Sequence, residues 1–318
     1  MALLEISKLE VTFTSGGERL GALRGVNMAV EAGSRTAILG ESGCGKTVTA
    51  LSIARLLPST ASVLGGKIVF DGRDMLALSE EELSGIRGSQ LCMIFQHAAL
   101  ALNPLYSVGR QIADVFQHHF GGGQKAAWHK AIEVLAATGI PNPQERARDY
   151  PHQYSGGMAQ RALIAMALVA KPKLLIADEP TSGLDVTIQH QVLELIQRVV
   201  GDLRATLLLI THDMAVVSAV CDRVVVMYAG VVMETGTVAQ VLEAPANPYS
   251  YELIKCFRRS KREQMPFIPG RVPDLREPGQ GCCFAPRCPR AEAICSREDP
   301  PTLEIGTGHF SRCHFGEP

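Results

Sequence analysis

At 318 residues the chain is long enough for one large domain with an extension, or for two domains. Hydrophobic residues make up 46 % of it and charged residues 20 %, so a sizeable core is available. The formal net charge of −1 lacks the positive excess typical of nucleic-acid-binding proteins, and we expect no nucleic-acid partner.

The apolar runs of the chain are short. The longest are Ala162–Ala170 and Val224–Met233, well below the roughly 18 residues that suggest a transmembrane helix. The start, Met1–Glu5, lacks the basic and apolar regions of a signal peptide. We therefore expect a chain that is not exported and does not span a membrane, so any membrane role comes through a partner.

The composition predicts two domains. Residues 1–258 alternate short Val/Ile/Leu strands with amphipathic helices, which indicates an α/β fold around a mostly parallel sheet. Residues 259–318 hold nine of the 18 prolines and five of the nine cysteines, with little helical or strand periodicity. We expect this irregular, Cys-rich extension to need something other than an apolar core for its order.

A phosphate-binding loop stands early in the chain. Residues 40–47 read Gly-Glu-Ser-Gly-Cys-Gly-Lys-Thr and fit the pattern G-x-x-x-x-G-K-[ST], with a predicted strand at 35–39 before it and a predicted helix at 48–57 after it. The alternative is a glycine-rich turn that matches by chance. The pattern predicts that Lys46 reaches the β- and γ-phosphates of a nucleotide and that Thr47 binds Mg²⁺. The predicted ATP contacts in and beside the loop are Gly40, Ser42, Gly43, Cys44, Gly45, Lys46, Thr47 and Val48.

A predicted strand at 173–178 ends in two acidic residues. Asp178 at its carboxyl end is suited to the Mg²⁺ shell, and Glu179 is suited to act as general base toward the attacking water. The alternative is a strand that happens to end in an acidic turn. Together with the phosphate loop, this strand predicts an ATPase.

The segment Tyr154–Arg161, at the start of a predicted helix over 155–171, resembles the signature motif of ATP-binding cassette (ABC) ATPases. The resemblance implies a P-loop NTPase fold with a mixed sheet core and a helical subdomain over about 97–170. It also implies a head-to-tail ATPase pair, because in this family the motif closes over the ATP of a partner subunit. The residues that would serve the partner's ATP are Ser155, Gly156, Gly157 and Gln160.

The other motifs of the family, before and after this segment, also occur in the family's order along the chain. Gln96, after a predicted strand at 91–95, matches the Q-loop glutamine, which contacts Mg²⁺ and the transmembrane partner. Residues 182–185 match the D-loop, which ends at Asp185. His212, after a predicted strand at 207–211, matches the switch histidine that contacts the γ-phosphate. Phe13 matches the aromatic residue that stacks on adenine, although an ordinary core phenylalanine is the alternative.

Residues 245–249 and the Cys-rich extension resemble the C-terminal region of oligopeptide/dipeptide importer ATPases, in particular those of dipeptide importers. The resemblance implies a peripheral subunit at the cytoplasmic face of the membrane. Its partners would be a homologous second ATPase, two transmembrane permease subunits that contact the surface near 96–109, and an extracytoplasmic solute-binding protein. His97–Leu102 departs from the group's usual sequence and leaves substrate and partner details open.

Three alternatives to peptide import remain. A related importer could carry nickel or a metal–metallophore complex, and an accessory ATPase of a phosphonate-cleaving lyase could resemble the same subfamily. A soluble ABC protein of translation or DNA repair is disfavoured, because only about a hundred residues separate Thr47 from Tyr154 and no heptad run lies between them.

Four cysteines of the extension could form one site: Cys282, Cys288, Cys295 and Cys313. Disulfides are disfavoured in a cytosolic chain, whereas four thiolates suit Zn²⁺ or an iron–sulfur cluster. The C-x₂₋₄-C pairs that structural zinc sites favour are absent. The family resemblance implies a [4Fe–4S] cluster, and zinc or free thiols stay open as alternatives.

Overall fold

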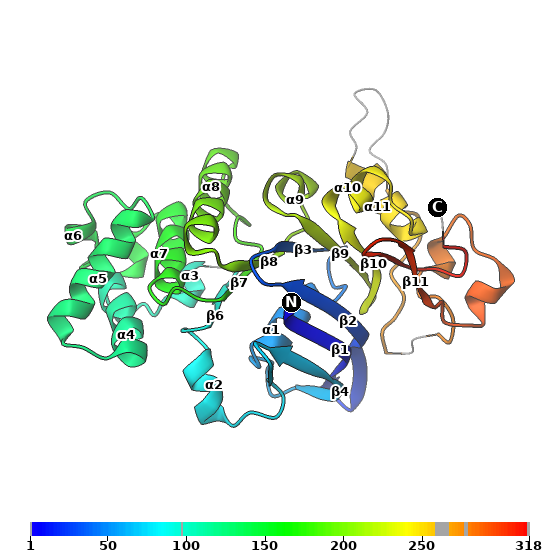
Figure 1. The fold of residues 1–318 in the computed structure, drawn as a ribbon, viewed down its shortest axis with the longest axis horizontal. Coiled ribbons are helices and arrows are strands. Elements are labelled where there is room, and N and C mark those ends of the chain that lie inside the picture. Colours follow the sequence, from blue (N-terminus) through cyan, green and yellow to red (C-terminus); the bar gives the residue numbers. More distant parts are fainter. Residues whose placement is uncertain (1, 97, 258–266, 277–278, 317–318) are drawn as a thin grey trace. The chain divides into compact units, whose positions relative to one another are not determined.

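The computed structural model describes residues 2–96, 98–257, 267–276 and 279–316 (Figure 1). The chain divides into two compact units. We call residues 1–76 with 210–318 the terminal unit, and residues 77–209 the central unit. The predicted domain boundary at 258/259 lies outside the described residues, and so does His97.

The first strands of the terminal unit form an antiparallel sheet in the order β2-β1-β4-β5. Its strands are β1 (Ala2–Ser15), β2 (Glu18–Glu31), β4 (Ala61–Phe70) and β5 (Arg73–Asp74). Gly16 and Gly17 join β1 to β2 with φ of 59° and 86°, the positive values that a tight hairpin turn requires. This part of the fold differs from the mostly parallel sheet expected from the sequence, because the glycine pair folds the chain straight back on itself.

The phosphate loop follows a parallel pair of strands in the same unit. β3 (Arg35–Leu39) has the predicted bounds and pairs in parallel with β9 (Arg223–Tyr228), and β10 (Val231–Thr237) returns antiparallel to β9. The helices of the terminal unit are α1 (Lys46–Ile53), α9 (Met214–Val220), α10 (Val238–Glu243) and α11 (Pro248–Phe257). Asp213 starts α9 by accepting the N–H groups of Ala215 and Val216.

The extension has more regular structure than its composition predicts. β11 (Thr302–Gly306) and β12 (His309–Arg312) form a hairpin, and β12 pairs with β10 (Figure 1). Two short 3₁₀ helices precede it, η2 (Ala285–Arg287) and η3 (Ala293–Ser296). Glu234 of β10, 1 % exposed, anchors the hairpin through His309 Nε2 at 2.7 Å and also accepts the N–H groups of Ala246 and Asn247.

An aromatic cluster also contributes to holding the extension. Phe284 is buried between Tyr228 of β9 and Tyr249 of α11, with ring centroids 5.4 and 5.2 Å away in edge-on geometry. The two tyrosine rings lie 4.5 Å apart. Such pairs stabilise by about 0.5–1.5 kcal/mol beyond the area they bury.

The central unit contains the strands of the second motif group. β6 (Leu91–Ile94) pairs in parallel with β7 (Leu174–Asp178), and β8 (Thr206–Ile210) lies next to β7. Every residue of β7 and β8 is buried, as expected for strands covered on both faces. Carboxyl ends of parallel strands meet at one sheet edge, so the segments after β6 and β7 lie close together.

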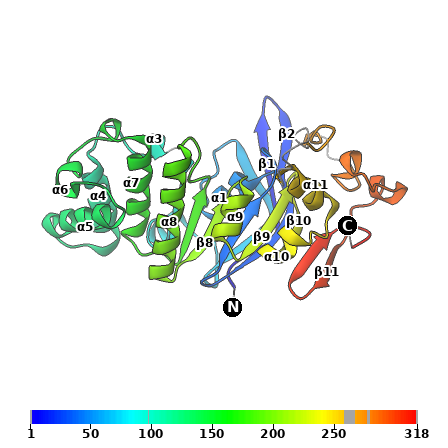
Figure 2. The same ribbon diagram turned by 90° about the horizontal axis from the view of Figure 1, so that it is seen from above.

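Helices make up the rest of the central unit. They are α2 (Glu80–Ile86), α3 (Ala98–Ala101), α4 (Val108–Phe120), α5 (Gln124–Ala137), α6 (Pro143–Arg146), the 3₁₀ helix η1 (Pro151–Gln153), α7 (Gly156–Leu168) and α8 (Val186–Leu203). Figures 1 and 2 show α4, α5 and α7 side by side. Among the described residues, no helix combines the length and apolar character needed to cross a bilayer.

Candidate active site

The phosphate loop is closed around its lysine. Lys46, at the first turn of α1, is 7 % exposed, and its Nζ donates to the carbonyl oxygens of Gly40 (2.9 Å) and Glu41 (3.0 Å). The ammonium group is thus held over the loop by two carbonyls, which a bound phosphate can replace as partners. The contact of Lys46 with the β- and γ-phosphates stays a prediction.

Two loop glycines are dictated by their surroundings. A Cβ on Gly40 would lie 2.2 Å from the carbonyl oxygen of Met227, and a Cβ on Gly45 would lie 2.7 Å from Leu23 Cδ2. Gly45 also has φ +108°, a value that L-residues rarely adopt. Ser42, Gly43 and Thr47 are exposed, and Val48 is half-buried.

Cys44 of the loop is buried, and burial raises the pKa of its thiol against the opposing effect of Lys46. The thiol therefore remains protonated near neutral pH and is a poor nucleophile. Any contact with a nucleotide comes from the Cys44 backbone rather than its side chain.

His212 lies at the same edge of the terminal unit as the phosphate loop. The Thr211 N–H donates to the carbonyl of Ile38 (3.3 Å), two residues before Gly40, and Thr211 Oγ1 accepts the N–H of Asp213 (3.0 Å). These bonds fix the backbone on both sides of His212, whose side chain is exposed. Phe13, on β1 of the same unit, is only partly buried, unlike an ordinary core phenylalanine.

Gln96 and Glu179 meet in the central unit. Gln96 Nε2 donates to Glu179 Oε2 at 2.9 Å and lies 3.4 Å from Ser182 Oγ. Gln96 follows β6 and Glu179 follows β7, so the parallel pairing of these strands brings the two side chains together. The sequence analysis placed Ser182 in the D-loop but did not predict that it lies beside Gln96.

The backbone at Glu179 is strained. Its φ is +44°, an unusual value for a residue with a side chain, and it directly follows the buried Asp178. Strain of about 1–3 kcal/mol persists where the surrounding structure imposes it, and it is common at active sites. The two consecutive carboxylates differ in exposure: Asp178 is 3 % exposed, whereas Glu179 is half-buried at the end of β7.

The signature segment opens α7 as predicted, although the helix runs over Gly156–Leu168 rather than 155–171. Ser155 is its N-cap and accepts the N–H of Met158 at 3.3 Å. Ser155 and Gly156 are exposed, and Gly157 is half-buried. Gln160 is 3 % exposed, and its Nε2 has no hydrogen-bond partner within the described ranges, so its side chain is not presented at the surface with the others.

Asp185 performs a similar structural task at α8. Its Oδ1 accepts the N–H of Ile188 at 3.0 Å, which caps the helix, while the residue remains exposed. The predicted site residues thus form two groups, one in each unit. Lys46, the loop and His212 belong to the terminal unit, whereas Gln96, Asp178, Glu179, Asp185 and the signature residues belong to the central unit.

Sequence reasoning missed the residues that hold Glu41, the second residue of the phosphate loop. The Glu41 N–H donates to the Tyr249 hydroxyl at 3.2 Å, and Glu41 Oε2 accepts from Arg287 Nη1 at 3.0 Å. Neither residue belongs to a nucleotide-binding motif. The sequence signal was weak: an arginine beside a cysteine of the extension, and a tyrosine in the run 245–249.

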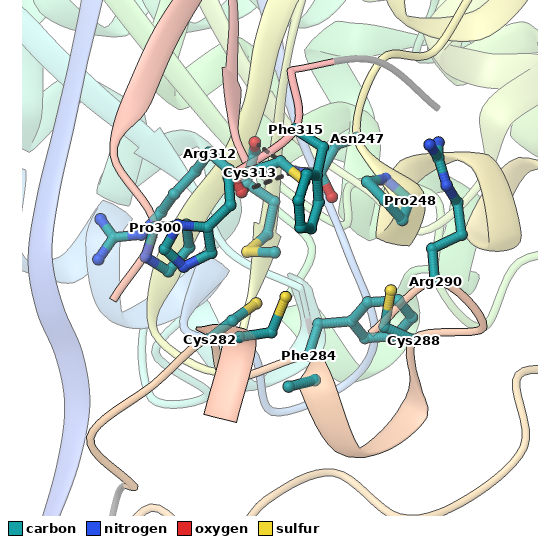
Figure 3. A pocket seen from close by; sticks show the side chains of 14 residues that line it. Asn247, Pro248, Cys282, Phe284, Cys288, Arg290, Pro300, Arg312, Cys313 and Phe315 are labelled. Atoms are coloured by element: carbon teal, nitrogen blue, oxygen red, sulfur yellow. Dashed lines mark hydrogen bonds between the residues drawn. The ribbon is translucent and has the colours of Figure 1, made fainter. Parts of the chain in front are cut away.

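The four predicted cysteines line one pocket of the extension, together with Phe284, and Figure 3 shows Cys282, Cys288 and Cys313 around it. The Cys282 N–H donates to the Cys295 carbonyl at 2.7 Å, which joins two of the segments. Burial raises the pKa of the Cys282 thiol, and the nearby Cys295 and Cys288 add to the rise. Within the part of the chain that the structure describes, no three His, Cys, Asp or Glu side chains are arranged to hold a single metal ion.

Comparison with known proteins matches both parts of this description. The family model "ABC transporter" matches residues 23–182, and the model "Oligopeptide/dipeptide transporter, C-terminal region" matches residues 233–295. Among solved structures, a dimeric post-hydrolysis state of the ATP-binding cassette MJ0796 bound to ADP and Pi has a TM-score of 0.67 at 25 % identity. It covers 74 % of this chain and 98 % of that one.

Relatives match almost from end to end. The probable peptide ABC transporter ATP-binding protein y4tR of Sinorhizobium fredii is 46 % identical, covering 98 % of this chain and 94 % of that protein. The oligopeptide transport ATP-binding protein OppD of Bacillus subtilis is 43 % identical over 97 % and 87 %. The dipeptide transport ATP-binding protein DppD of Escherichia coli is 40 % identical over 99 % and 97 %. The chain therefore belongs to the ABC transporter ATPases, in the branch with the oligopeptide/dipeptide transporter C-terminal region.

Proposed function

We propose that this chain is the ATP-hydrolysing subunit of a membrane transporter that imports dipeptides, oligopeptides or related solutes. The observation that carries this proposal is one chain with both an ABC ATPase region and the oligopeptide/dipeptide C-terminal region. Relatives named for peptide, oligopeptide and dipeptide transport match it over nearly its whole length. The ABC transporter region supports the use of ATP, and the C-terminal region supports the assignment to the peptide-transport branch.

In this proposal the terminal unit binds the nucleotide. The loop N–H groups and Lys46 hold the β- and γ-phosphates, His212 contacts the γ-phosphate, and Phe13 stacks on adenine. Mg²⁺ would be held by Thr47, Gln96 and Asp178, a set of oxygen ligands that suits this hard cation. The bound cation would offset the negative charge of the phosphates.

The central unit supplies the proposed catalytic base. Glu179 accepts a proton from the attacking water, and Gln96, which donates to Glu179 Oε2 at 2.9 Å, keeps that carboxylate oriented until the site is assembled. Water then attacks the γ-phosphorus, and the bond to the β–γ bridging oxygen breaks to leave ADP and phosphate. Catalysis rests on positioning and charge stabilisation rather than on a covalent intermediate.

The signature segment is proposed to serve a partner's nucleotide. Ser155 and Gly156 are exposed at the N-terminus of α7, where helix N–H groups and the helix dipole favour an anion. Gly157 and Gln160 are assigned to the same surface by the motif, although the burial of Gln160 favours a supporting role for its side chain. Asp185, exposed at the start of α8, is proposed to contact the partner ATPase in the same closure.

We further propose a homologous second ATPase, two transmembrane permease subunits and an extracytoplasmic solute-binding protein as partners, with this chain peripheral at the cytoplasmic face. The segment 96–109 supports the permease contact. Leu100 and Leu105 are 84 % and 77 % exposed within it, and such apolar side chains favour a protein partner. Tyr106, stacked under Arg110 at 4.4 Å, extends this surface.

Co-purification tests the proposed function. Isolated in mild detergent from its own cells, the chain is expected to carry permease subunits, and peptide-loaded binding protein is expected to raise the ATPase rate of the reconstituted complex. A soluble enzyme core in place of permeases would support an accessory ATPase of the phosphonate-lyase type. Stimulation by a nickel or metallophore carrier, and not by peptides, would support metal import.

For the extension we propose a [4Fe–4S] cluster bound by Cys282, Cys288, Cys295 and Cys313. The donor set fits this group, because four thiols line one pocket and the arginines Arg290 and Arg312, which also line it, can offset the charge of an anionic cluster. When bound, such a cluster would cross-link the segments and could exchange an electron.

Colour and metal content test the cluster. Protein purified without oxygen is expected to be brown, with broad visible absorbance, and to contain iron and acid-labile sulfide. Cys288→Ser should remove the colour. Cys283→Ser is the matched control and should keep it, because Cys283 faces Met233 Sδ at 3.9 Å and does not line the pocket. A colourless preparation with one zinc would support the zinc alternative, and one with neither metal would support free thiols.

A further inference from the structure

Arg287 of the extension is a buried junction between the extension and the phosphate loop. Its side chain is 6 % exposed. Nη1 donates to Glu41 Oε2 at 3.0 Å and to the Tyr228 hydroxyl at 3.1 Å, while Nε and Nη2 donate to the carbonyls of Pro269 and Ile268, each at 3.0 Å. The guanidinium also stacks over the Tyr228 ring at 5.6 Å. All of these residues belong to the terminal unit.

Glu41 is the loop residue that this junction holds, and it is anchored at three points. Its N–H donates to the Tyr249 hydroxyl at 3.2 Å, its carbonyl accepts from Lys46 Nζ at 3.0 Å, and its carboxylate accepts from Arg287. The second carboxylate oxygen, Oε1, is buried, and no described residue bonds to it. The guanidinium of Arg287 is therefore the compensation that the structure shows for this charge.

A carboxylate in a phosphate-binding loop is an electrostatic problem. The loop gathers N–H groups and one ammonium group toward an anion, and Glu41 adds a negative charge one residue from Gly40 and five from Lys46. In a partly dehydrated site an uncompensated carboxylate repels phosphate, whereas a carboxylate paired with a planar guanidinium does not.

We propose that Arg287 is a positioning residue of the phosphate loop: it neutralises Glu41 and fixes it against the extension, so that ATP binding depends on the extension being docked. Nothing in the motif pattern assigns the extension a part in nucleotide binding. Arg287 reaches the loop because η2 carries it between Phe284 of the aromatic cluster and Cys288 of the thiol pocket. A disturbance at either neighbour is thus transmitted to Glu41 through one turn of helix.

The test measures ATP binding to the full-length chain, which does not require a partner. Arg287→Met, which keeps the length of the side chain without its charge, is expected to weaken ATP binding at least about tenfold, as for losing a charge-assisted pair. The double variant Glu41→Gln/Arg287→Met is expected to return to within about threefold of the wild type, because the uncompensated charge is gone. Arg276→Met is the matched control, since Arg276 is half-exposed and pairs with Glu18 and Asp274 away from the loop.

Every outcome of this test either supports or rejects the proposed role of Arg287. This inference rests on the proposed role of the phosphate loop, so Lys46→Ala is measured beside it: normal ATP binding by Lys46→Ala would reject that role itself. Weak ATP binding by Lys46→Ala with normal ATP binding by Arg287→Met would reject only the inference.

The double variant tests the charge argument. If adding Glu41→Gln does not restore ATP binding, the loss comes from the bonds of Arg287 with Ile268 and Pro269, and the charge argument is overturned. If Arg287→Met does not fold, a soluble double variant supports the proposal and an insoluble one overturns it.

Discussion

Replacing Glu179 by Gln is expected to slow ATP hydrolysis at least about a hundredfold in the assembled transporter while leaving Mg²⁺-ATP binding in place. The amide cannot take a proton from the attacking water. Its oxygen can still accept from Gln96 Nε2, which lies 2.9 Å from the present carboxylate, so the local structure is retained. Single-turnover hydrolysis and ATP affinity, measured on the same complex, separate the two effects.

The control for this substitution is Glu194→Gln, the same chemical change on the exposed face of α8, where Glu194 Oε1 lies 3.2 Å from His190 Nε2. It should leave the hydrolysis rate unchanged. Near-normal turnover of Glu179→Gln would show that another group is the base. Loss of ATP binding in that variant would instead mean that Glu179 has a structural task, in keeping with the strained backbone at this residue.

The strands and loops next to the motifs were predictable because short-range chemistry determines them. The apolar run of β3 has its predicted bounds. The helix after the glycine-rich turn is also present, although α1 runs over Lys46–Ile53 rather than the predicted 48–57. The helix at the signature motif begins where Ser155 can cap it. In each case the residues that specify the element lie within a few positions of it.

The extension was harder to predict because its order comes from distant residues. β12 is four residues long, and its place beside β10 is anchored by the contact between Glu234 and His309, 75 positions apart in the chain. A period-two pattern over four or five residues is too short to distinguish from a loop. The one local signal was Gly306-Thr307-Gly308, a turn sequence between two short runs.

The link from Arg287 to Glu41 was invisible for the same reason. The two residues are 246 positions apart, and no motif contains them both. The acidic residue in the variable part of the phosphate loop was nevertheless a usable clue, since a partly buried carboxylate there is stabilised by a nearby cation. The sequence indicates that such a partner is needed but cannot say which of 31 Lys and Arg residues supplies it.

The second large effect is expected from a substitution in the signature segment. Of its two glycines, Gly156 is the better position for this test. A Cβ on Gly157 would lie 2.7 Å from Ile188 Cγ2, so any substitution there also disturbs the packing of α7 on α8. A Cβ on Gly156 meets only Leu184 Cδ2 at 3.5 Å, an ordinary contact. Gly156→Asp therefore changes the charge of the signature surface with little effect on the fold of this chain.

We expect Gly156→Asp to lower turnover by roughly a hundredfold or more at the site whose phosphate loop belongs to the partner ATPase. A carboxylate in the first turn of α7 is favourable for the isolated helix, because it faces the positive end of the helix dipole. In the closed pair the same carboxylate would face the partner's γ-phosphate, and like charges repel most where water is excluded. The substitution should therefore leave the fold of the isolated chain intact and impair only the closed ATPase pair.

The measurement is nucleotide occupancy and turnover of the purified complex, with Gly156→Asn as a control of nearly equal size and no charge. Gly156→Asp should bind ATP at this chain's own Lys46 with unchanged affinity, and Gly156→Asn should lose markedly less turnover. Full activity of Gly156→Asp, or brisk hydrolysis by a strictly monomeric chain, would reject the two-subunit mechanism. A transporting complex with two copies of this chain would keep the mechanism and replace only the second ATPase, because each signature segment would then face the phosphate loop of an identical partner.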